Sequence, residues 1–371
     1  MNTSPEPKKE SEDEQLMALA FTIGRRGLGR TWPNPAVGAV VAKDGLILGR
    51  GWTQQGGRPH AESEALARAG ATARGATLYV TLEPCAHEGR TPPCTDTIDA
   101  AQISRVVSAM VDPNPLVAGA GHWQLAERGI VVEIGLGAEE ARRVHAGHIR
   151  RMRDGRPHVT VKLAVSADEK VALAGRRPFA ITGETAWRHV HLMRAMSDAV
   201  VTGIATVLSD DPQLTCRLPG MHSPVRIVLD SALRLPVASK LVTSTRIAPL
   251  WVFAGVSASA EREHALVAQG VEVRRVQDSS GMLDIVAVLK ALAERGITRL
   301  MVEAGPKLTT ALLAADLIDE VALFRSPTAI GQDGIDALDE LPLSALANSP
   351  QLRRAVSQSI GPDLLECYER A

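Results

Sequence analysis

The sequence has few aromatic residues, no surplus of basic charge and no long apolar run. Phe, Trp and Tyr make up 3% of the 371 residues, too few for the stacking surface on which proteins hold single-stranded nucleic acid. Lys and Arg total 41 against 42 Asp and Glu, so the basic footprint of a nucleic-acid-binding protein is missing. No apolar stretch approaches the ~20 residues of a membrane span. These absences predict a protein that binds neither nucleic acid nor membranes.

Cysteine is also scarce, and its spacing argues against a disulfide framework. The four cysteines are Cys85, Cys94, Cys216 and Cys367, and the last two lie far apart with no regular spacing. Such a chain fits a reducing compartment, which predicts a cytoplasmic protein. Residues 1–14 are polar and charged, with no apolar segment behind them. They do not form a signal peptide, and we expect a disordered tail.

The length and the pattern of apolar residues predict two α/β domains. A chain of 371 residues corresponds to roughly two domains. From a helix at 15–26 onwards, predicted helices and strands alternate, and the second half fits a mostly parallel sheet covered on both faces. The arginine-rich stretch 149–157 is interpreted as a solvated helix end and linker. We therefore expect one domain over 15–152 and a second over 157–371.

His60, Cys85 and Cys94 supply one imidazole and two thiols, which suit a tetrahedral zinc with one open position. His60 precedes a predicted helix and Cys94 precedes another, where the helix dipole favours a thiolate. Glu62 falls in the first turn after His60, close enough to move protons without being a ligand. Zinc deaminases of nucleobases use this arrangement to replace an exocyclic amine with oxygen. The pattern therefore predicts hydrolytic deamination with Glu62 as the proton carrier.

Two features of this pattern leave other interpretations open. The motif of zinc nucleobase deaminases ends in Cys-x-x-Cys, whereas eight residues separate Cys85 and Cys94 here. Within that insertion His87 offers a fourth ligand, and a zinc site closed by four protein ligands would be structural. Arg90 and Thr91 in the same loop offer contacts to a substrate with more polar groups than a plain base. An alternative function is deamination of a nucleic-acid base, with an inactive or unrelated C-terminal domain.

Three segments carry a family resemblance: Glu-Pro-Cys-Ala-His-Glu-Gly-Arg-Thr-Pro-Pro-Cys at 83–94, Asn-Pro-Ala-Val-Gly at 34–38 and Asp-Pro-Asn-Pro at 112–115. They resemble the bifunctional pyrimidine deaminase/reductase of riboflavin biosynthesis. The resemblance implies a cytidine-deaminase-like domain followed by a dihydrofolate-reductase-like domain, in a homo-oligomer. The first domain would hydrolyse the 2-amino group of the pyrimidine ribotide 2,5-diamino-6-(5-phosphoribosylamino)pyrimidin-4(3H)-one. The second would use NADPH to reduce the ribosyl side chain of 5-amino-6-(5-phosphoribosylamino)uracil to ribityl.

The resemblance also implies roles for individual residues. The zinc ligands of the family fall on His60, Cys85 and Cys94, its proton carrier on Glu62, and its pyrimidine-binding residues on Asn34 and His87. The residues implied to bind NADPH are Ala164, Thr206, Asp210, Ser231, Gly305, Pro306, Lys307, Leu308, Thr309, Thr310 and Ala311. Those implied to contact the reductase substrate are Arg194, Leu214, Arg217 and Glu303. Arginine suits the substrate phosphate because its planar fork binds two oxygens.

Apart from the resemblance, the second half gives weak evidence for a dinucleotide. Loops 203–206 and 303–306 follow predicted strands, where small residues and a helix N-terminus can approach phosphate, but without the resemblance ordinary strand-to-helix turns are the favoured explanation. Two segments depart from the family. Residues 178–182 read Pro-Phe-Ala-Ile-Thr where many relatives have Ser-x-Trp-Ile-Thr, so the tryptophan that contacts the cofactor is missing. Residues 166–170 read Ser-Ala-Asp-Glu-Lys where many have Ser-Leu-Asp-Gly-Lys.

Overall fold

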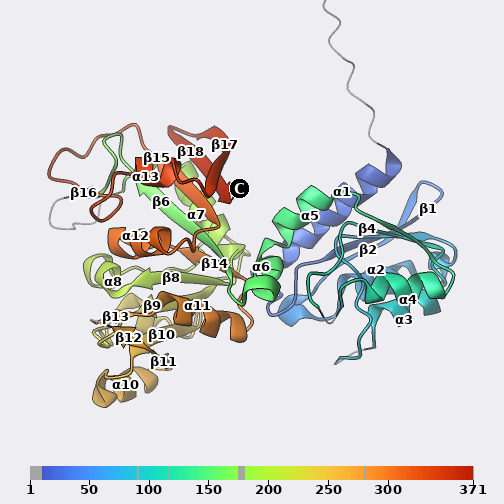
Figure 1. Ribbon diagram of the computed structural model, residues 1–371, viewed down its shortest axis with the longest axis horizontal. Helices are drawn as coiled ribbons and strands as arrows, with labels where there is room; N and C mark the ends of the chain where they lie inside the picture. Colours follow the sequence, from blue (N-terminus) through green and yellow to red (C-terminus); the bar gives the residue numbers. More distant parts are fainter. Residues whose placement is uncertain (1–10, 90–91, 116, 174–179, 280, 371) are drawn as a thin grey trace, which may run out of the picture. The chain divides into compact units, whose positions relative to one another are not determined.

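The chain was analysed as a computed structural model, which describes residues 11–89, 92–115, 117–173, 180–279 and 281–370. By its internal contacts the chain divides into two compact units, Met1–Asp154 and Gly155–Ala371 (Figure 1). Among the described residues, no helix combines the length and the apolar character needed to cross a membrane. Each unit has a main sheet of its own.

The first unit is a five-stranded sheet in the order β2-β1-β3-β4-β5. β1 pairs antiparallel with β2 and β3, whereas β3, β4 and β5 are parallel. Its strands are β1 (Gly38–Lys43), β2 (Leu46–Trp52), β3 (Thr77–Val80), β4 (Arg105–Ser108) and β5 (Val131–Ile134). Its helices are α1 (Glu12–Gly24), α2 (Ala61–Ala69), α3 (Cys94–Ala100), α4 (Ala120–Glu127), α5 (Ala138–Val144) and α6 (Ala146–Asp154).

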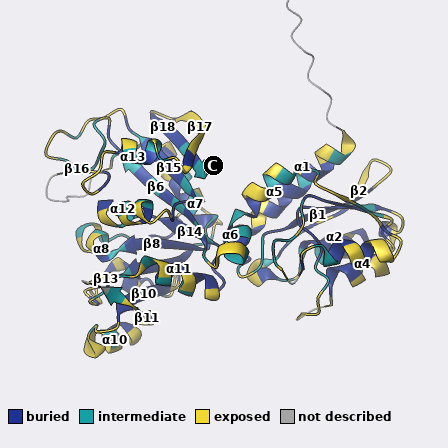
Figure 2. Cartoon of the chain, viewed as in Figure 1, coloured by how far each residue is buried: buried dark blue, intermediate teal, exposed yellow. Residues whose placement is uncertain are grey.

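Strand β1 shows how the sequence produces helices on both faces of this sheet. Successive side chains of a strand point to opposite faces. Val41 packs in the core that α2, α3 and α4 cover, whereas Val40 packs in the core beneath α1 and α5. Both faces of β1 are therefore buried, as Figure 2 shows for the middle of this sheet, and a continuous apolar run is what such a strand requires.

Two glycines of β2 let α2 lie directly on the sheet. A Cβ at Gly49 would be 2.2 Å from the carbonyl oxygen of Ala65, and one at Gly51 would be 2.3 Å from that of Ala61. No side chain fits at these distances, so the backbone of α2 can approach β2 closely. Because α2 begins at Ala61, this approach fixes its first turn, which carries the predicted proton carrier Glu62.

The second unit is built on a nine-stranded sheet in the order β11-β10-β9-β8-β14-β6-β15-β18-β17. Neighbouring strands are parallel from β11 to β15 and antiparallel from β15 to β17. The main strands are β6 (His158–Val165), β8 (Ala199–Gly203), β9 (Val225–Leu229), β10 (Leu250–Gly255), β11 (Glu272–Val276), β14 (Arg299–Val302), β15 (Glu320–Arg325), β17 (Leu352–Ile360) and β18 (Asp363–Arg370). Two small ladders pair β7 (Lys170–Ala172) with β16 (Ile335–Asp336) and β12 (Asp278–Ser279) with β13 (Met282–Leu283). The helices are α7 (Glu184–Ala195), α8 (Ile204–Asp210), α9 (Lys240–Thr243), α10 (Ala260–Val267), α11 (Ile285–Glu294), α12 (Pro306–Ala314) and α13 (Ser344–Ala347).

The structure confirms the α/β class and corrects two details of the sequence analysis. Helix α1 begins at Glu12 rather than at residue 15, because Ser11 and Glu14 form a capping box, so the tail expected over 1–14 overlaps its first turn. The sheet of the second unit is mostly parallel, as predicted, and β17 and β18 add an antiparallel hairpin at one edge. Arg156, expected in a solvated linker, instead forms a bidentate ion pair with the buried carboxylate of Asp319.

Candidate functional site

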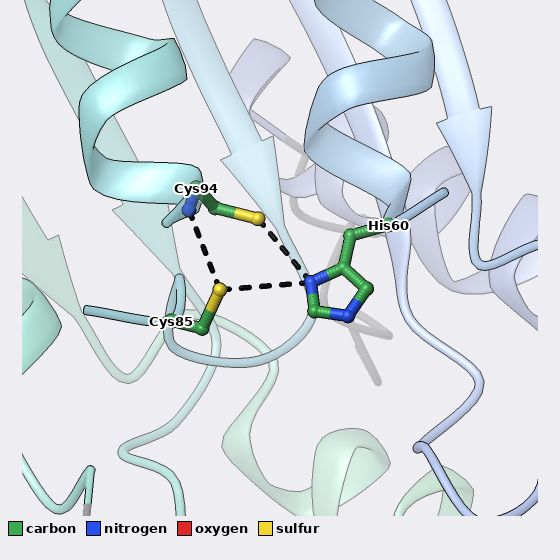
Figure 3. Close-up of side chains that lie close together, drawn as sticks. All are labelled: His60, Cys85 and Cys94. Atoms are coloured by element: carbon green, nitrogen blue, oxygen red, sulfur yellow. Dashed lines mark hydrogen bonds between the residues drawn. The ribbon is translucent and has the colours of Figure 1, made fainter. Parts of the chain in front are cut away.

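The zinc ligands predicted from the sequence come together in the first unit. Figure 3 shows His60, Cys85 and Cys94 facing one another, and their ligand atoms all lie within 4.8 Å of one another. His60 is the N-cap of α2 and Cys94 is the first residue of α3. Nδ1 of His60 lies 3.3 Å from Sγ of Cys94 and 3.6 Å from Sγ of Cys85. The backbone N–H of Cys94 also donates to Sγ of Cys85 at 3.3 Å.

These distances fit a zinc ion. Zn–S bonds of about 2.3 Å and Zn–N bonds of about 2.0 Å at tetrahedral angles separate nitrogen and sulfur by about 3.5 Å. In the part of the chain that the structure describes, the cluster offers three ligands, and His87 is exposed in the loop outside it. Three protein ligands are typical of catalytic zinc sites, whereas structural sites are closed by a fourth. The geometry therefore favours a catalytic site over a structural one.

The two thiols of the cluster differ in how readily they lose a proton. The hydrogen bond between them lowers the pKa of Cys85 to about 4, against the opposing effect of burial. The same hydrogen bond, together with burial, raises the pKa of Cys94. Cys85 therefore ionises more readily than Cys94. A divalent cation that displaces the remaining thiol proton gains two thiolate ligands.

Glu62 lies in the first turn of α2, two residues after His60, and is 4% exposed. Burial raises the pKa of the Glu62 carboxyl group, and the charge of His60 only partly opposes this effect. A carboxyl group with a raised pKa can accept and release a proton near neutral pH. The structure places the predicted proton carrier beside the predicted ligands.

Of the two predicted pyrimidine-binding residues, the structure brings only Asn34 to the cluster. Its Nδ2 donates to the carbonyl oxygen of Gly57 at 2.9 Å and lies 3.5 Å from Nε2 of His60. Gly57 has a φ of +87°, and a Cβ there would be 2.7 Å from Nδ2 of Asn34. Only glycine meets both requirements. His87 is exposed, and Arg90 and Thr91 lie outside the described residues.

The sequence analysis missed Glu83, which precedes Pro84 and the ligand Cys85. Its side chain is fully buried, where a carboxylate needs partners. It accepts hydrogen bonds from the backbone N–H groups of Asp112 at 2.9 Å, Gly119 at 2.9 Å, Gly121 at 2.8 Å and His122 at 3.4 Å. The carboxylate thereby ties the loop that carries Cys85 to the segment 112–122. No periodic pattern marked a role for this residue; the available signals were a charged residue directly after a buried strand and its place at the start of the 83–94 segment.

In the second unit a cavity of about 390 Å³ lies at the carboxyl ends of β6, β8 and β14. Ligands of open α/β sheets bind outside the carboxyl ends of the strands. The predicted residues that line this cavity are Ala164, Arg194, Thr206, Asp210, Leu214, Glu303, Gly305 and Pro306. Residues predicted to bind nucleotide and residues predicted to bind substrate therefore share one cavity.

Other predicted reductase residues lie outside the described cavity lining. Ser231 follows β9, and five belong to α12 beyond its first residue: Lys307, Leu308, Thr309, Thr310 and Ala311. Arg217 is exposed, and its guanidinium lies over the ring of Trp187, which does line the cavity. Pro178 and Phe179 lie outside the described residues. Ala180, where many relatives have tryptophan, forms part of the wall.

Two of the predicted substrate-binding residues bind each other. Arg194 donates to Glu303 from Nε at 2.5 Å and from Nη2 at 2.9 Å, and Nη1 donates to the carbonyl oxygen of Thr215 at 3.0 Å. Burial opposes ionisation of Glu303, but Arg194 outweighs it and lowers the pKa of this carboxyl group. Lys162, which the sequence analysis missed, lies 3.8 Å from Glu303 and also lines the cavity. A lysine among the apolar residues of β6 was the available signal.

Leu214 and Glu169 have a left-handed backbone although they carry side chains. Leu214 has a φ of +55° and lines the cavity. Strain of this kind is often kept at ligand-binding sites, where the surrounding structure enforces it. Glu169 has a φ of +62° at the position where many relatives have glycine. The departure from the family noted in the sequence therefore falls on a backbone conformation that glycine adopts at no steric cost.

Comparison with known families assigns both units. Residues 10–110 match the cytidine and deoxycytidylate deaminase zinc-binding region. Residues 157–365 match the RibD C-terminal domain. The second match accounts for most of the C-terminal half, so the alternative of a nucleic-acid deaminase with an unrelated C-terminal domain is not supported.

Individual relatives match nearly the whole chain. The riboflavin biosynthesis protein RibD of Escherichia coli (strain K12) is 40% identical over 367 residues, which cover 95% of this chain and 98% of that protein. RibD of Aquifex aeolicus is 39% identical, with 96% and 98% covered. The solved structure of Acinetobacter baumannii RibD has a TM-score of 0.85 at 36% identity, with 97% and 99% covered. The chain belongs to the RibD family and is a bifunctional enzyme of riboflavin biosynthesis, with a zinc-dependent deaminase and an NADPH-dependent reductase.

Proposed function

We propose that His60, Cys85 and Cys94 hold the zinc ion and that Glu62 carries the protons of deamination. When bound, zinc supplies a Lewis acid that makes water nucleophilic near neutral pH. Glu62 takes a proton from the attacking water and delivers protons to the ring nitrogen and the departing amine, so that oxygen replaces the 2-amino group and ammonia leaves. Support comes from the burial of Glu62 and the raised pKa of its carboxyl group.

We assign the pyrimidine of the substrate to Asn34 and His87. The amide of Asn34 is held by Gly57 beside His60, and an amide offers both a donor and an acceptor to a pyrimidine edge. His87 lies in the exposed loop between the two cysteine ligands, where an incoming substrate can reach it. Its assignment rests on the family resemblance.

We assign NADPH and the reductase substrate to the cavity of the second unit. The nucleotide residues are Ala164, Thr206, Asp210, Ser231, Gly305, Pro306, Lys307, Leu308, Thr309, Thr310 and Ala311. The first turn of α12 offers backbone N–H groups to a phosphate. The substrate residues are Arg194, Leu214, Arg217 and Glu303. NADPH supplies the hydride when bound, and the chain orients the open sugar against it.

The proposal includes the extent and the assembly of the two domains. We place the deaminase over 15–152 and the reductase over 157–371, which the division of the chain after Asp154 supports. A homo-oligomer is proposed from the family resemblance. A cytoplasmic location is proposed from the sparse, unpaired cysteines. Light scattering of the purified chain tests the assembly.

The observation that carries the proposal is the spacing of one nitrogen and two sulfurs at zinc-binding distances beside a buried carboxyl group. The test is incubation of the purified, zinc-loaded chain with the diamino pyrimidine ribotide, followed by ultraviolet spectra and mass. Without NADPH, we expect exchange of one amine for oxygen. With NADPH, we expect the further addition of two hydrogens. An unchanged substrate in both reactions would contradict the proposal.

A further inference from the structure

One face of helix α7 carries three residues that belong to the reductase cavity or lie against it. Trp187, His191 and Arg194 are spaced four and three residues apart, which places them on the same side of a helix. Trp187 and Arg194 line the cavity. His191 is fully buried, and its ring centre lies 4.0 Å from that of Trp187. The helix thus presents an aromatic ring, a buried imidazole and a guanidinium in a row.

This face of α7 contacts Arg217 at two points, its backbone N–H and its guanidinium group. The backbone N–H of Arg217 donates to Nδ1 of His191 at 3.0 Å. The guanidinium carbon of Arg217 lies 5.3 Å from the ring centre of Trp187, within the range of a cation–π interaction. His191 therefore fixes the backbone of Arg217, and Trp187 restricts the position of its guanidinium group.

The imidazole of His191 can act as an acceptor only while Nδ1 carries no proton. Burial, reinforced by the charges of Arg194 and Arg217, lowers the pKa of His191 to about 4. The ring is therefore neutral at physiological pH. The hydrogen bond that holds the backbone of Arg217 is kept under the conditions in which the enzyme works.

The two arginines predicted to bind the reductase substrate are in different electrostatic states. Arg194 forms an ion pair with Glu303, to which it donates two hydrogen bonds. Within the described parts of the chain, the ion pairs include none between Arg217 and a carboxylate. An unpaired guanidinium is suited to bind a phosphate through its fork of donors. Arg217 is therefore the better of the two candidates for the phosphate of the substrate.

We propose that Trp187 and His191 are positioning residues, which hold Arg217 in place to bind the phosphate of the reductase substrate. The inference rests on the role of Arg217 in the proposed function. It adds two residues that the family resemblance did not supply. Neither residue has to touch the reacting atoms, and both act through the arginine.

The test compares the reduction of 5-amino-6-(5-phosphoribosylamino)uracil with that of the same compound without its phosphate. Loss of the aromatic face in Trp187→Leu should raise the KM for the phosphorylated substrate about threefold. Loss of the acceptor in His191→Leu should raise it about fivefold. The KM for the dephosphorylated compound should rise less than that for the phosphorylated one, and the ratio of the two KM values is the quantity that reports the positioning of Arg217. His191→Asn, which offers a side-chain oxygen near the position of Nδ1, should restore the KM.

Two controls accompany these variants. Arg188 is the exposed neighbour of Trp187 on α7 and pairs with Glu184, and Arg188→Ala should leave both KM values unchanged. Deamination by the same chains should also be unchanged. Equal losses on the phosphorylated and dephosphorylated compounds would show a merely structural role and overturn the inference.

A double-mutant cycle separates the inference from the proposed function beneath it. Arg217→Ala should raise the KM for the phosphorylated substrate by about 10- to 100-fold, and adding Trp187→Leu to it should change nothing more. If Trp187→Leu has the same effect with and without Arg217, the positioning role is wrong while the role of Arg217 stands. If Arg217→Ala leaves the KM unchanged, the assignment of the phosphate to Arg217 itself is wrong.

Discussion

The two halves of this chain build their sites from different kinds of sequence information. The deaminase cluster takes its ligands from the starts of two helices and the loop before one of them. Its chemistry depends on which residue types are present. The reductase cavity is lined by residues from strand ends and helices between Lys162 and Ile335, many of which have small side chains. A metal site can therefore be predicted from a short motif, whereas a nucleotide-binding cavity can be identified only once the fold is known.

The largest expected effect tests whether the cluster of the first half is catalytic. Glu62→Gln removes the proton carrier but no ligand, so deamination should fall by about 1,000-fold or more while the zinc content and the reductase activity stay unchanged. Steady-state kinetics and metal analysis measure these quantities. Glu127, which is exposed on α4, provides the matched control Glu127→Gln. Deamination that survives in Glu62→Gln would remove Glu62 from its role.

The second effect should fall on the other half alone. Burial raises the pKa of Asp319, but the hydrogen bond and charge of Arg156 and the charge of His158 outweigh burial, so the pKa is lowered overall. The ionised carboxylate then stabilises the second unit fully above about pH 4, and this contribution is lost as the pH falls through the lowered pKa. Asp319→Asn should reduce the free energy of unfolding by about 3 kcal/mol at pH 7.

Urea unfolding at several pH values measures this change. The difference between Asp319→Asn and the wild type should shrink below about pH 4. Reduction should be lost at a lower temperature than in the wild type, whereas deamination should keep its wild-type thermal profile. Asp333→Asn, at an exposed position of the same unit, should behave as the wild type. A difference that stays constant with pH would contradict the assigned ion pair.

A smaller effect separates substrate binding from metal binding within the first half. Gly57→Ala adds a Cβ that would lie 2.7 Å from Nδ2 of Asn34, and it imposes a side chain on a left-handed backbone. The displaced amide should raise the KM for deamination about tenfold, the equivalent of one lost hydrogen bond. The zinc content should not change. Gly56→Ala also lies at a positive φ but has open space around its Cβ, so it controls for backbone strain alone.

The sequence could predict the features that recur at regular intervals or in one compact motif. Alternating helices and strands predicted the α/β class, and the triad His60, Cys85 and Cys94 is adjacent to helix starts that the pattern also predicted. Strand β17 gave no signal because all seven residues between its ends are exposed, so no apolar alternation marks it. The sequence analysis did not identify Glu83, Lys162 and Trp187. Their roles depend on backbone amides and charges that lie close to them only in the folded chain.

The smallest expected effect concerns the departure from the family at residue 169. A left-handed residue with a side chain is disfavoured by roughly 1–2 kcal/mol, and glycine loses part of this advantage because its unfolded chain is more flexible. Glu169→Gly should therefore raise the stability of the second unit by about 0.5 kcal/mol. Thermal unfolding measures it. Glu169→Gln keeps the strain and removes the ion pair with Arg325, so a gain in both variants would show that the backbone is not the cause.

The buried carboxylate of Glu83 has a consequence for how relatives of this protein can diverge. It is surrounded by four backbone donors, which only a substitution to proline could remove because every other residue type carries a backbone N–H. A glutamine at position 83 would place the two hydrogens of its amide group against those N–H donors. An apolar residue there would leave all four donors without an acceptor. A descendant that had abandoned zinc chemistry could discard both thiols and still be obliged to keep this acid.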